Sequence, residues 1–156
     1  MVHFVPLENK MDRTQYEELL KTAWASEFAF FLKSAGFHWN VEGSDFYEYH
    51  LIFERIYTEV YGSIDTFAEE LRAARIYTPA SFTLMEDMSL VECQDGVPMA
   101  SSMAQELLVD SDACAEMFRV AFEAAEAMGD HGLSNFLADR QDAHKKHSWM
   151  LRSTLK

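Results

Sequence analysis

The sequence predicts an all-α protein, a four-helix bundle with a long crossover between its second and third helices. Four long segments carry apolar side chains at spacings of three and four residues, the period of a helix with one buried face. Between the second and third segments, residues 77–98 show no single period and contain Pro79, Gly96 and Pro98, which interrupt helices. The 156 residues can bury one hydrophobic core. We therefore expect a single domain over residues 1–156.

The first two helices are expected to form a hairpin. The run from Thr14 to Glu17 matches a capping box, which closes the open amino end of a helix, so we predict a helix over residues 14–39. Asn40 to Gly43 form a turn, and the proline-free stretch 44–76 is predicted as the second helix. Its apolar side chains fall on one face. This core face comprises Phe46, Tyr49, Phe53, Ile56, Val60, Ile64, Phe67 and Leu71.

The rest of the chain supplies the other pair of helices. A short helix is expected within the crossover, over residues 81–88. The third long helix is predicted over 100–128, and the run Asp130-His131-Gly132 interrupts it. The fourth begins at about residue 133 and carries Phe136, Leu137, Met150 and Leu151. Four long helices with one long connection are typical of a ferritin-like bundle.

Five side chains able to bind metal lie in and just before the second helix, at offsets of 12, 4, 11 and 4 residues: His38, His50, Glu54, Asp65 and Glu69. His38 precedes the hairpin bend by six residues and His50 follows it by six, so the two histidines should be level. A helix turns by about 100° per residue, so His50, Glu54, Asp65 and Glu69 fall on one stripe of its surface. Asp65 nevertheless follows His50 by 15 residues, about 22 Å along a helix, whereas metal–ligand bonds are about 2 Å long. One helix cannot bring both ends of the stripe to one ion.

A second copy of the chain solves this problem. If two such helices lie antiparallel with a two-fold axis between Glu59 and Val60, position 50 faces position 69 and position 54 faces position 65. Helices pack about 8–10 Å apart, which side chains from both sides can span, and a two-fold axis repeats every contact. The spacing therefore predicts a homodimer with two equivalent metal sites. Its contact surface, here called the seam face, comprises His50, Glu54, Tyr57, Thr58, Tyr61, Asp65 and Glu69.

Composition argues against several other classes of protein. The formal net charge of −13 opposes binding to phosphate backbones, and Lys10 and Arg13 alone do not make a DNA-binding arm. No apolar run is long enough to span a membrane, and the amino terminus lacks the pattern of a secretory signal. Cys93 and Cys114 have no metal or redox spacing, so we expect reduced thiols in a cytoplasmic protein.

The block containing HWNVEG, DF, ERIY and IDTFAEELRA closely resembles the Dps family, the DNA-binding proteins from starved cells, or mini-ferritins. The ending NFLADRQDAHKKHSWMLRSTL is similar to the last helix of that family. The resemblance implies a hollow shell of twelve four-helix bundles. It also implies that the shell oxidises Fe(II), preferably with hydrogen peroxide, and stores the ferric oxide inside. Each ferroxidase centre would hold two irons at a two-fold interface, in agreement with the spacing argument.

The resemblance also implies roles for individual residues. His38 and His50 match the histidines of one subunit, and Asp65 and Glu69 match the carboxylates of its partner, with Glu69 bridging the two irons. The family usually has aspartate where this chain has Glu54. The extra methylene is expected to change the second, weaker iron site.

Two further features are implied by the resemblance. Trp39 follows the first histidine, as in many relatives, where it takes up stray oxidising equivalents. Acidic residues at the start of the last helix surround the family's three-fold entry pores. The matching positions here are Glu126, Asp130 and His131, while Asn135 replaces an acid found in some relatives.

Some alternatives stay open at this point. The chain could instead be a DNA-protecting nucleoid protein, or a structural shell without ferroxidase activity, and the working oxidant could be oxygen rather than peroxide. His144 and His147 are three residues apart but have no acidic partner of matching helical phase, so we expect structural roles for them. For Tyr57 and Tyr61, packing at the interface is favoured over electron donation.

Overall fold

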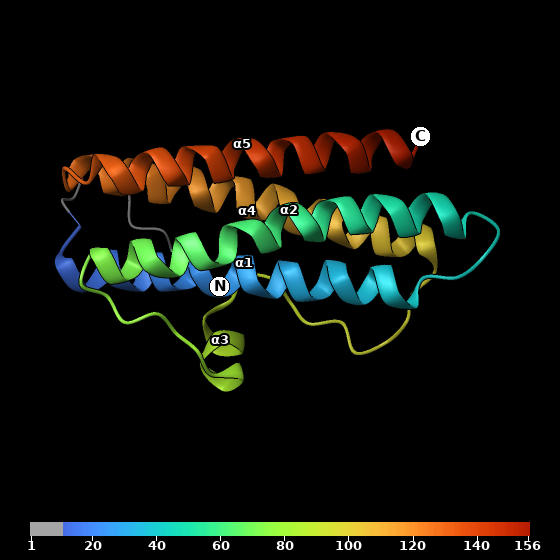
Figure 1. Cartoon of the computed structure of the whole chain (residues 1–156), viewed down its shortest axis with the longest axis horizontal. Coiled ribbons are helices and arrows are strands. Elements are labelled where there is room, and N and C mark those ends of the chain that lie inside the picture. The colour runs from blue at the N-terminus through green and yellow to red at the C-terminus, as the bar shows by residue number, and fades with distance from the viewer. Residues whose placement is uncertain (1–10) are drawn as a thin grey trace.

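The structure is a computed structural model that describes residues 11–156, and these residues form five helices and no strands. Four of the helices are long and lie side by side, and a short one lies outside them (Figure 1). They are α1 (Arg13–Asn40), α2 (Phe46–Ala73), α3 (Phe82–Met88), α4 (Ala100–Ala127) and α5 (His131–Thr154). The predicted all-α bundle with a short helix in its crossover is confirmed. Lys10, which enters the sequence argument on DNA binding, lies outside the described residues.

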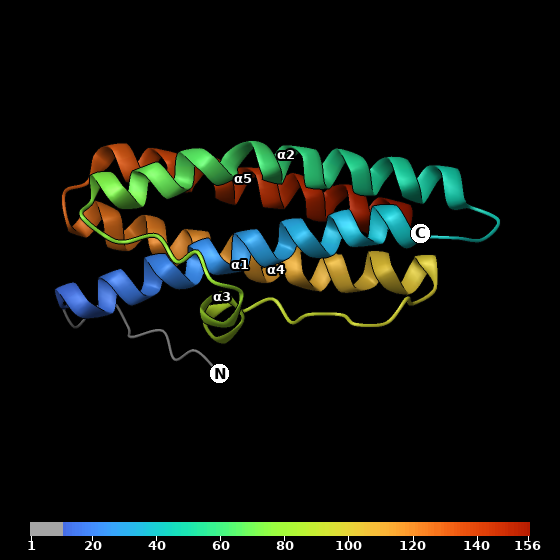
Figure 2. The same cartoon turned by 60° about the horizontal axis from the view of Figure 1, so that its bottom comes forward.

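The crossover sets the topology. The helices α1 and α2 form one antiparallel hairpin, and α4 and α5 form the other (Figure 1). Residues 74–99 return along the bundle between them, so that α2 and α4 run parallel, and α3 packs against α1 (Figure 2). The hydrophobic core lies between the long helices, and its largest fully buried side chains include Tyr16, Phe30, Phe53, Phe67 and Phe118. Within residues 11–156, no helix has the length and apolar character needed to cross a membrane.

The first helix begins at a different capping box from the predicted one. The Asp12 carboxylate accepts a hydrogen bond from the Gln15 backbone N–H at 2.8 Å, and the Gln15 side chain accepts from the Asp12 N–H at 3.0 Å. The prediction of Thr14 with Glu17 was wrong by two residues. Both pairs have residue types that favour a capping box, and only the observed start leaves Asp12 in the extended conformation that capping requires.

Two helices end in the same hydrogen-bonded motif. After α2, Arg75 adopts φ 65° and its N–H donates to the Arg72 carbonyl, while the Ile76 N–H donates to the Leu71 carbonyl. After α4, Gly129 adopts φ 76° and the same pair of bonds follows. Both are Schellman motifs, which satisfy the last carbonyls of a helix. They end α2 three residues before the predicted 76. They also place the break after α4 at Gly129, so that α5 starts two residues before the predicted 133.

The predicted core face of α2 is largely confirmed. Tyr49, Phe53, Ile56, Val60, Phe67 and Leu71 are buried, and Ile64 is half-buried. Phe46 is the exception, because it is exposed and its ring stacks on that of His50, with centroids 4.8 Å apart. It is the first residue of α2, beyond the reach of the core, and therefore packs along its own helix instead.

Candidate metal centre

The turn between α1 and α2 brings His38 and His50 face to face. Their rings stack with centroids 3.8 Å apart and an angle of 16° between the planes. Each ring is also fixed by the other residue's backbone. The Nδ1 atom of His38 lies 2.8 Å from the His50 carbonyl oxygen, and the Nδ1 atom of His50 lies 2.8 Å from the His38 carbonyl oxygen. The expectation that the two histidines are level across the hairpin is confirmed.

These reciprocal bonds determine which ring nitrogen can bind a metal ion. A carbonyl oxygen only accepts hydrogen bonds, so Nδ1 of each histidine carries the proton and donates it. The lone pair of a neutral ring is then on Nε2. Histidine ligands in metal sites are commonly oriented in this way, with one nitrogen donating to a carbonyl and the other free for the ion. His38 and His50 therefore form a pair of parallel imidazoles with both Nε2 atoms available.

Aromatic neighbours help to hold the pair in place. The Tyr57 ring centroid lies 5.1 Å from that of His38, and Phe46 covers His50. His38 is only 8 % exposed and His50 is half-buried, so the rings are supported without being sealed from the surface.

The predicted carboxylates lie on the exposed side of α2. Glu54, Asp65 and Glu69 are all exposed, with Glu54 one turn beyond His50 and Asp65 one turn before Glu69. A hydrogen bond to Asp65 and the negative charge of that residue raise the pKa of the Glu69 carboxyl. Two acids held this close repel one another when both are ionised, and a bound cation would remove that repulsion.

A single chain does not complete a metal site. Within residues 11–156, no three His, Cys, Asp or Glu side chains are grouped closely enough to hold an ion. The histidine pair and the Asp65–Glu69 pair lie at opposite ends of the seam face, separated by about four turns of α2. The predicted centre therefore needs a second chain. Large apolar side chains are also exposed on α1, α2 and α3: Leu32, Trp39, Leu51, Tyr61, Phe82 and Leu84.

Comparisons with known proteins show the family to which the chain belongs. The family model described as a Ferritin-like domain matches residues 17–156. The DNA protection during starvation protein of Brevibacillus brevis is 31% identical over 140 residues, which cover 88% of this chain and 92% of that protein. The chain belongs to the Dps family of ferritin-like proteins.

Solved Dps structures share its fold. A Dps protein from Bacillus brevis is 27% identical with a TM-score of 0.86, and the match covers 94% of this chain and 100% of that one. A Dps protein from Vibrio cholerae O1 is 28% identical with a TM-score of 0.84, covering 92% and 90%. The Vibrio protein is described as a member of a broad superfamily of ferritin-like diiron-carboxylate proteins.

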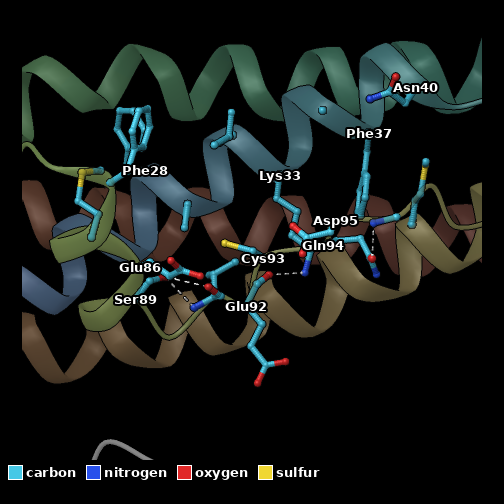
Figure 3. Close-up of a pocket in the computed structure, with 18 of the residues that line it drawn as sticks. Phe28, Lys33, Phe37, Asn40, Glu86, Ser89, Glu92, Cys93, Gln94 and Asp95 are labelled. Atoms are coloured by element: carbon cyan, nitrogen blue, oxygen red, sulfur yellow. Dashed lines mark hydrogen bonds between the residues drawn. The ribbon is translucent and has the colours of Figure 1, made fainter.

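One cavity of this Dps chain lies beside the predicted centre rather than in it. It has a volume of about 450 Å³ and is lined by α1, α3, the crossover and Met103 of α4. Figure 3 shows Lys33 reaching from α1 to the crossover, where its Nζ donates to the Glu92 carbonyl oxygen at 3.0 Å. Of the predicted site residues only Trp39 lines the cavity, and none of the five predicted ligands does.

The residues predicted to line a pore meet at the turn between α4 and α5. Asp130 caps α5 by accepting from the Leu133 N–H at 3.2 Å. His131 Nδ1 lies 3.3 Å from the Glu126 carboxylate, and the Ser134 hydroxyl donates to the same oxygen. The bonds from Ser134 and His131 lower the pKa of the Glu126 carboxyl. The structure thus gathers the three residues at one exposed corner, and their pore role in the Dps shell stays a prediction.

One polar cluster was not predicted. We call it the interior cluster; it comprises Glu27, Glu59, Arg140, His144 and His147. The acidic partners of the two histidines come from other helices, where helical phase along α5 does not reach: His144 Nε2 lies 2.6 Å from Glu27 and His147 Nε2 lies 2.9 Å from Glu59. Two signals in the sequence point to it. Glu27 interrupts an apolar run of α1, and positions 140, 144 and 147 share one helix face.

Proposed function

We propose that this Dps protein assembles into a hollow shell, oxidises Fe(II) at centres shared between two subunits, and stores the ferric product inside. The observation that supports this most strongly is the His38–His50 pair, with both Nε2 atoms free at the edge of an exposed face. The same face carries Asp65 and Glu69, and antiparallel pairing of two α2 helices would bring them to the partner's histidines. Mixed carboxylate and imidazole ligands suit iron in both oxidation states.

Each residue has a defined task in the proposed centre. His38 and His50 bind from one subunit, with Glu54 beside them, and the partner subunit supplies Asp65 and Glu69. The paired acids provide the negative charge that two Fe(II) substrates need. Tyr57 and Tyr61 lie between the two centres of a dimer and would pack across the two-fold axis. Exposed apolar side chains around them support burial of this surface in a complex.

The proposed oxidant is hydrogen peroxide, with oxygen as the alternative. Two Fe(II) ions give one electron each, and one peroxide takes both electrons with two protons to form two water molecules. Because both electrons are delivered at one centre, no hydroxyl radical is released. The ferric ions then pass to acidic inner walls, for which the charge of −13 provides ample carboxylates. We expect twelve subunits per shell, as the family resemblance implies.

The deciding experiment removes the acidic half of the centre. In Asp65→Ala/Glu69→Ala, we expect peroxide-driven Fe(II) oxidation, followed by ferric absorbance in a stopped-flow instrument, to fall to the rate without protein. Assembly should persist, as measured by light scattering after size exclusion. The matched control is Asp112→Ala/Glu116→Ala, another exposed acid pair four residues apart, on α4. Oxidation that stays at the wild-type rate in the first variant would overturn the proposal and leave a structural shell as the answer.

DNA protection by direct binding is the second candidate, because several relatives carry that name. Six of the twelve Lys and Arg side chains in residues 11–156 form ion pairs with acids, for example Arg13 with Glu17 and Lys146 with Asp142, and the net charge of −13 opposes DNA binding. Removal of Fe(II) and peroxide would protect DNA without contact. We expect no gel shift of duplex DNA at physiological salt. A shift that weakens steeply with added salt would instead support a nucleoid role.

A further inference from the structure

The interior cluster lies halfway along the bundle, where α1, α2 and α5 face one another. Arg140 is its centre. The Arg140 Nη2 and Nε atoms donate to Glu27 Oε1 at 2.6 and 3.0 Å, and Nη1 and Nη2 donate to the two oxygens of Glu59 at 2.6 and 2.9 Å. Glu27 is 0% exposed. One guanidinium therefore joins the buried carboxylate of Glu27 on α1 to the more exposed carboxylate of Glu59 on α2.

Two histidines also donate hydrogen bonds to these carboxylates. His144 bonds the second oxygen of Glu27 and His147 bonds Glu59, and both imidazoles are buried. Because an ionised carboxylate only accepts, each Nε2 donates. His147 Nδ1 then has a lone pair, and it is buried without any hydrogen-bond partner. Buried polar atoms are nearly always paired, so this orphan needs an explanation.

The pKa shifts favour ionised carboxylates in this cluster. Burial by itself would raise the pKa of Glu27, but His144 and Arg140 lower it below its usual range. Burial opposes ionisation of Glu59 as well, yet its bonds to His147 and Arg140 outweigh burial and lower its pKa. Burial lowers the pKa of His147. Two carboxylates are therefore ionised, while Arg140 supplies one full positive charge.

With Arg140 in place, the two carboxylates and two imidazoles around it are not grouped closely enough to hold an ion. They are nevertheless the ligand types from which helix bundles build metal sites. We propose that the Arg140 guanidinium occupies the place of a divalent cation and so keeps transition metals out of the bundle interior. Its planar fork satisfies both carboxylates at once, which a metal ion could do only by displacing a buried charge. Arg140 is thus a residue that determines metal specificity, since it leaves the seam face as the place where metal can bind. This inference is independent of the proposed iron oxidation.

The test is to remove the guanidinium and look for a new site. The parent is Asp65→Ala/Glu69→Ala, in which the seam face lacks its acids, and the probe is Co(II), whose visible absorption reports its ligands. In that parent, Arg140→Ala is expected to gain a saturable Co(II) site with new visible bands and a rise in Tm on adding Co(II). Glu27→Gln added to this variant should abolish the gain. Arg119→Ala, which removes an exposed arginine that also bridges two carboxylates, is the matched control and should gain nothing.

Removing Arg140 takes the cationic partner from the buried Glu27 carboxylate and from Glu59, so the variant could need metal in order to fold. A second variant, Arg140→Ala/Glu59→Gln, has one carboxylate fewer left without the guanidinium. It is tested for Co(II) binding in the same way. If neither variant folds alone, refolding with Co(II) decides, because rescue supports the proposal and absence of rescue overturns it. Folded variants that bind no more Co(II) than their parent would also overturn it. The proposal would also be overturned if the parent, with Arg140 intact, already bound Co(II) and lost that binding on Glu27→Gln.

Discussion

Arg140 and Glu27 are 113 positions apart in the chain, yet two hydrogen bonds of 2.6 and 3.0 Å join them inside the bundle. The bonds tie the last helix to the first. Both side chains are buried, so water does not compete for them. Breaking a buried ion pair is costly, because the remaining charge loses its partner without regaining its hydration.

The first prediction concerns the pH dependence of stability. Glu27→Gln should lower the free energy of unfolding by about 3 kcal/mol or more at pH 7, since it leaves Arg140 with one carboxylate. The folded-state pKa of Glu27 is lowered, so its contribution is complete above its unfolded pKa of about 4.5 and is lost as pH falls below that value.

The measurement is thermal unfolding of wild type and Glu27→Gln from pH 7 to pH 3, at one fixed protein concentration because assembly affects Tm. The two Tm values should converge below about pH 4.5. A Tm difference that stays constant across this range would show that Glu27 does not contribute as a paired anion.

The second prediction follows from the shared centre. His38→Ala/His50→Ala and Asp65→Ala/Glu69→Ala should each be inactive alone, yet regain activity when unfolded, mixed in equal amounts and refolded together. Random pairing makes about half of the dimers mixed, and each mixed dimer has one intact centre of two, so about a quarter of the wild-type rate is expected. Each variant refolded alone is the control. A mixture as inactive as its components would argue that the four ligands act within one chain.

The third prediction concerns Trp39. Its side chain is 63% exposed and adjoins His38, whereas Trp149 on α5 is 61% exposed and lies far from the seam face along the chain. Equal exposure makes Trp149 a matched control for attack from solution. During repeated Fe(II) and peroxide additions, peptide mass spectrometry should find oxygen added to Trp39 well before Trp149. Equal oxidation of the two would mean that oxidising equivalents arise in bulk solution and not at the seam.

The fourth prediction distinguishes the observed helix start from the predicted one. Asp12→Ala removes the observed cap and should cost about 1 kcal/mol, which thermal unfolding detects as a fall in Tm. Thr14→Ala should change Tm little, because the Thr14 side chain caps nothing in this structure. If Thr14→Ala proved the more harmful, the helix would start where the sequence pattern alone places it.

Local pattern was enough to predict the helices and the histidine pair. The helical period and the short turn both depend on residues close together in the sequence. His38 and His50 lie equally far from the turn, so their positions already place them at the same level of the hairpin. The same holds for the seam face, because residues on one helix have a fixed angular relation. Helix ends were less predictable. Asp12 and Thr14 are both suitable caps, and small differences in the surrounding contacts select between them.

By itself, the sequence determined the four-helix order, the crossover and the stripe of ligands on α2, because each depends on spacing along one stretch of chain. Only the tertiary structure decided that Arg140 bonds Glu27 and Glu59 and so joins three helices. Those side chains come from separate helices, and helical period fixes the phase of each helix but not its rotation or height against its neighbours. Packing of the whole core sets both, and with them the partners of every buried charge.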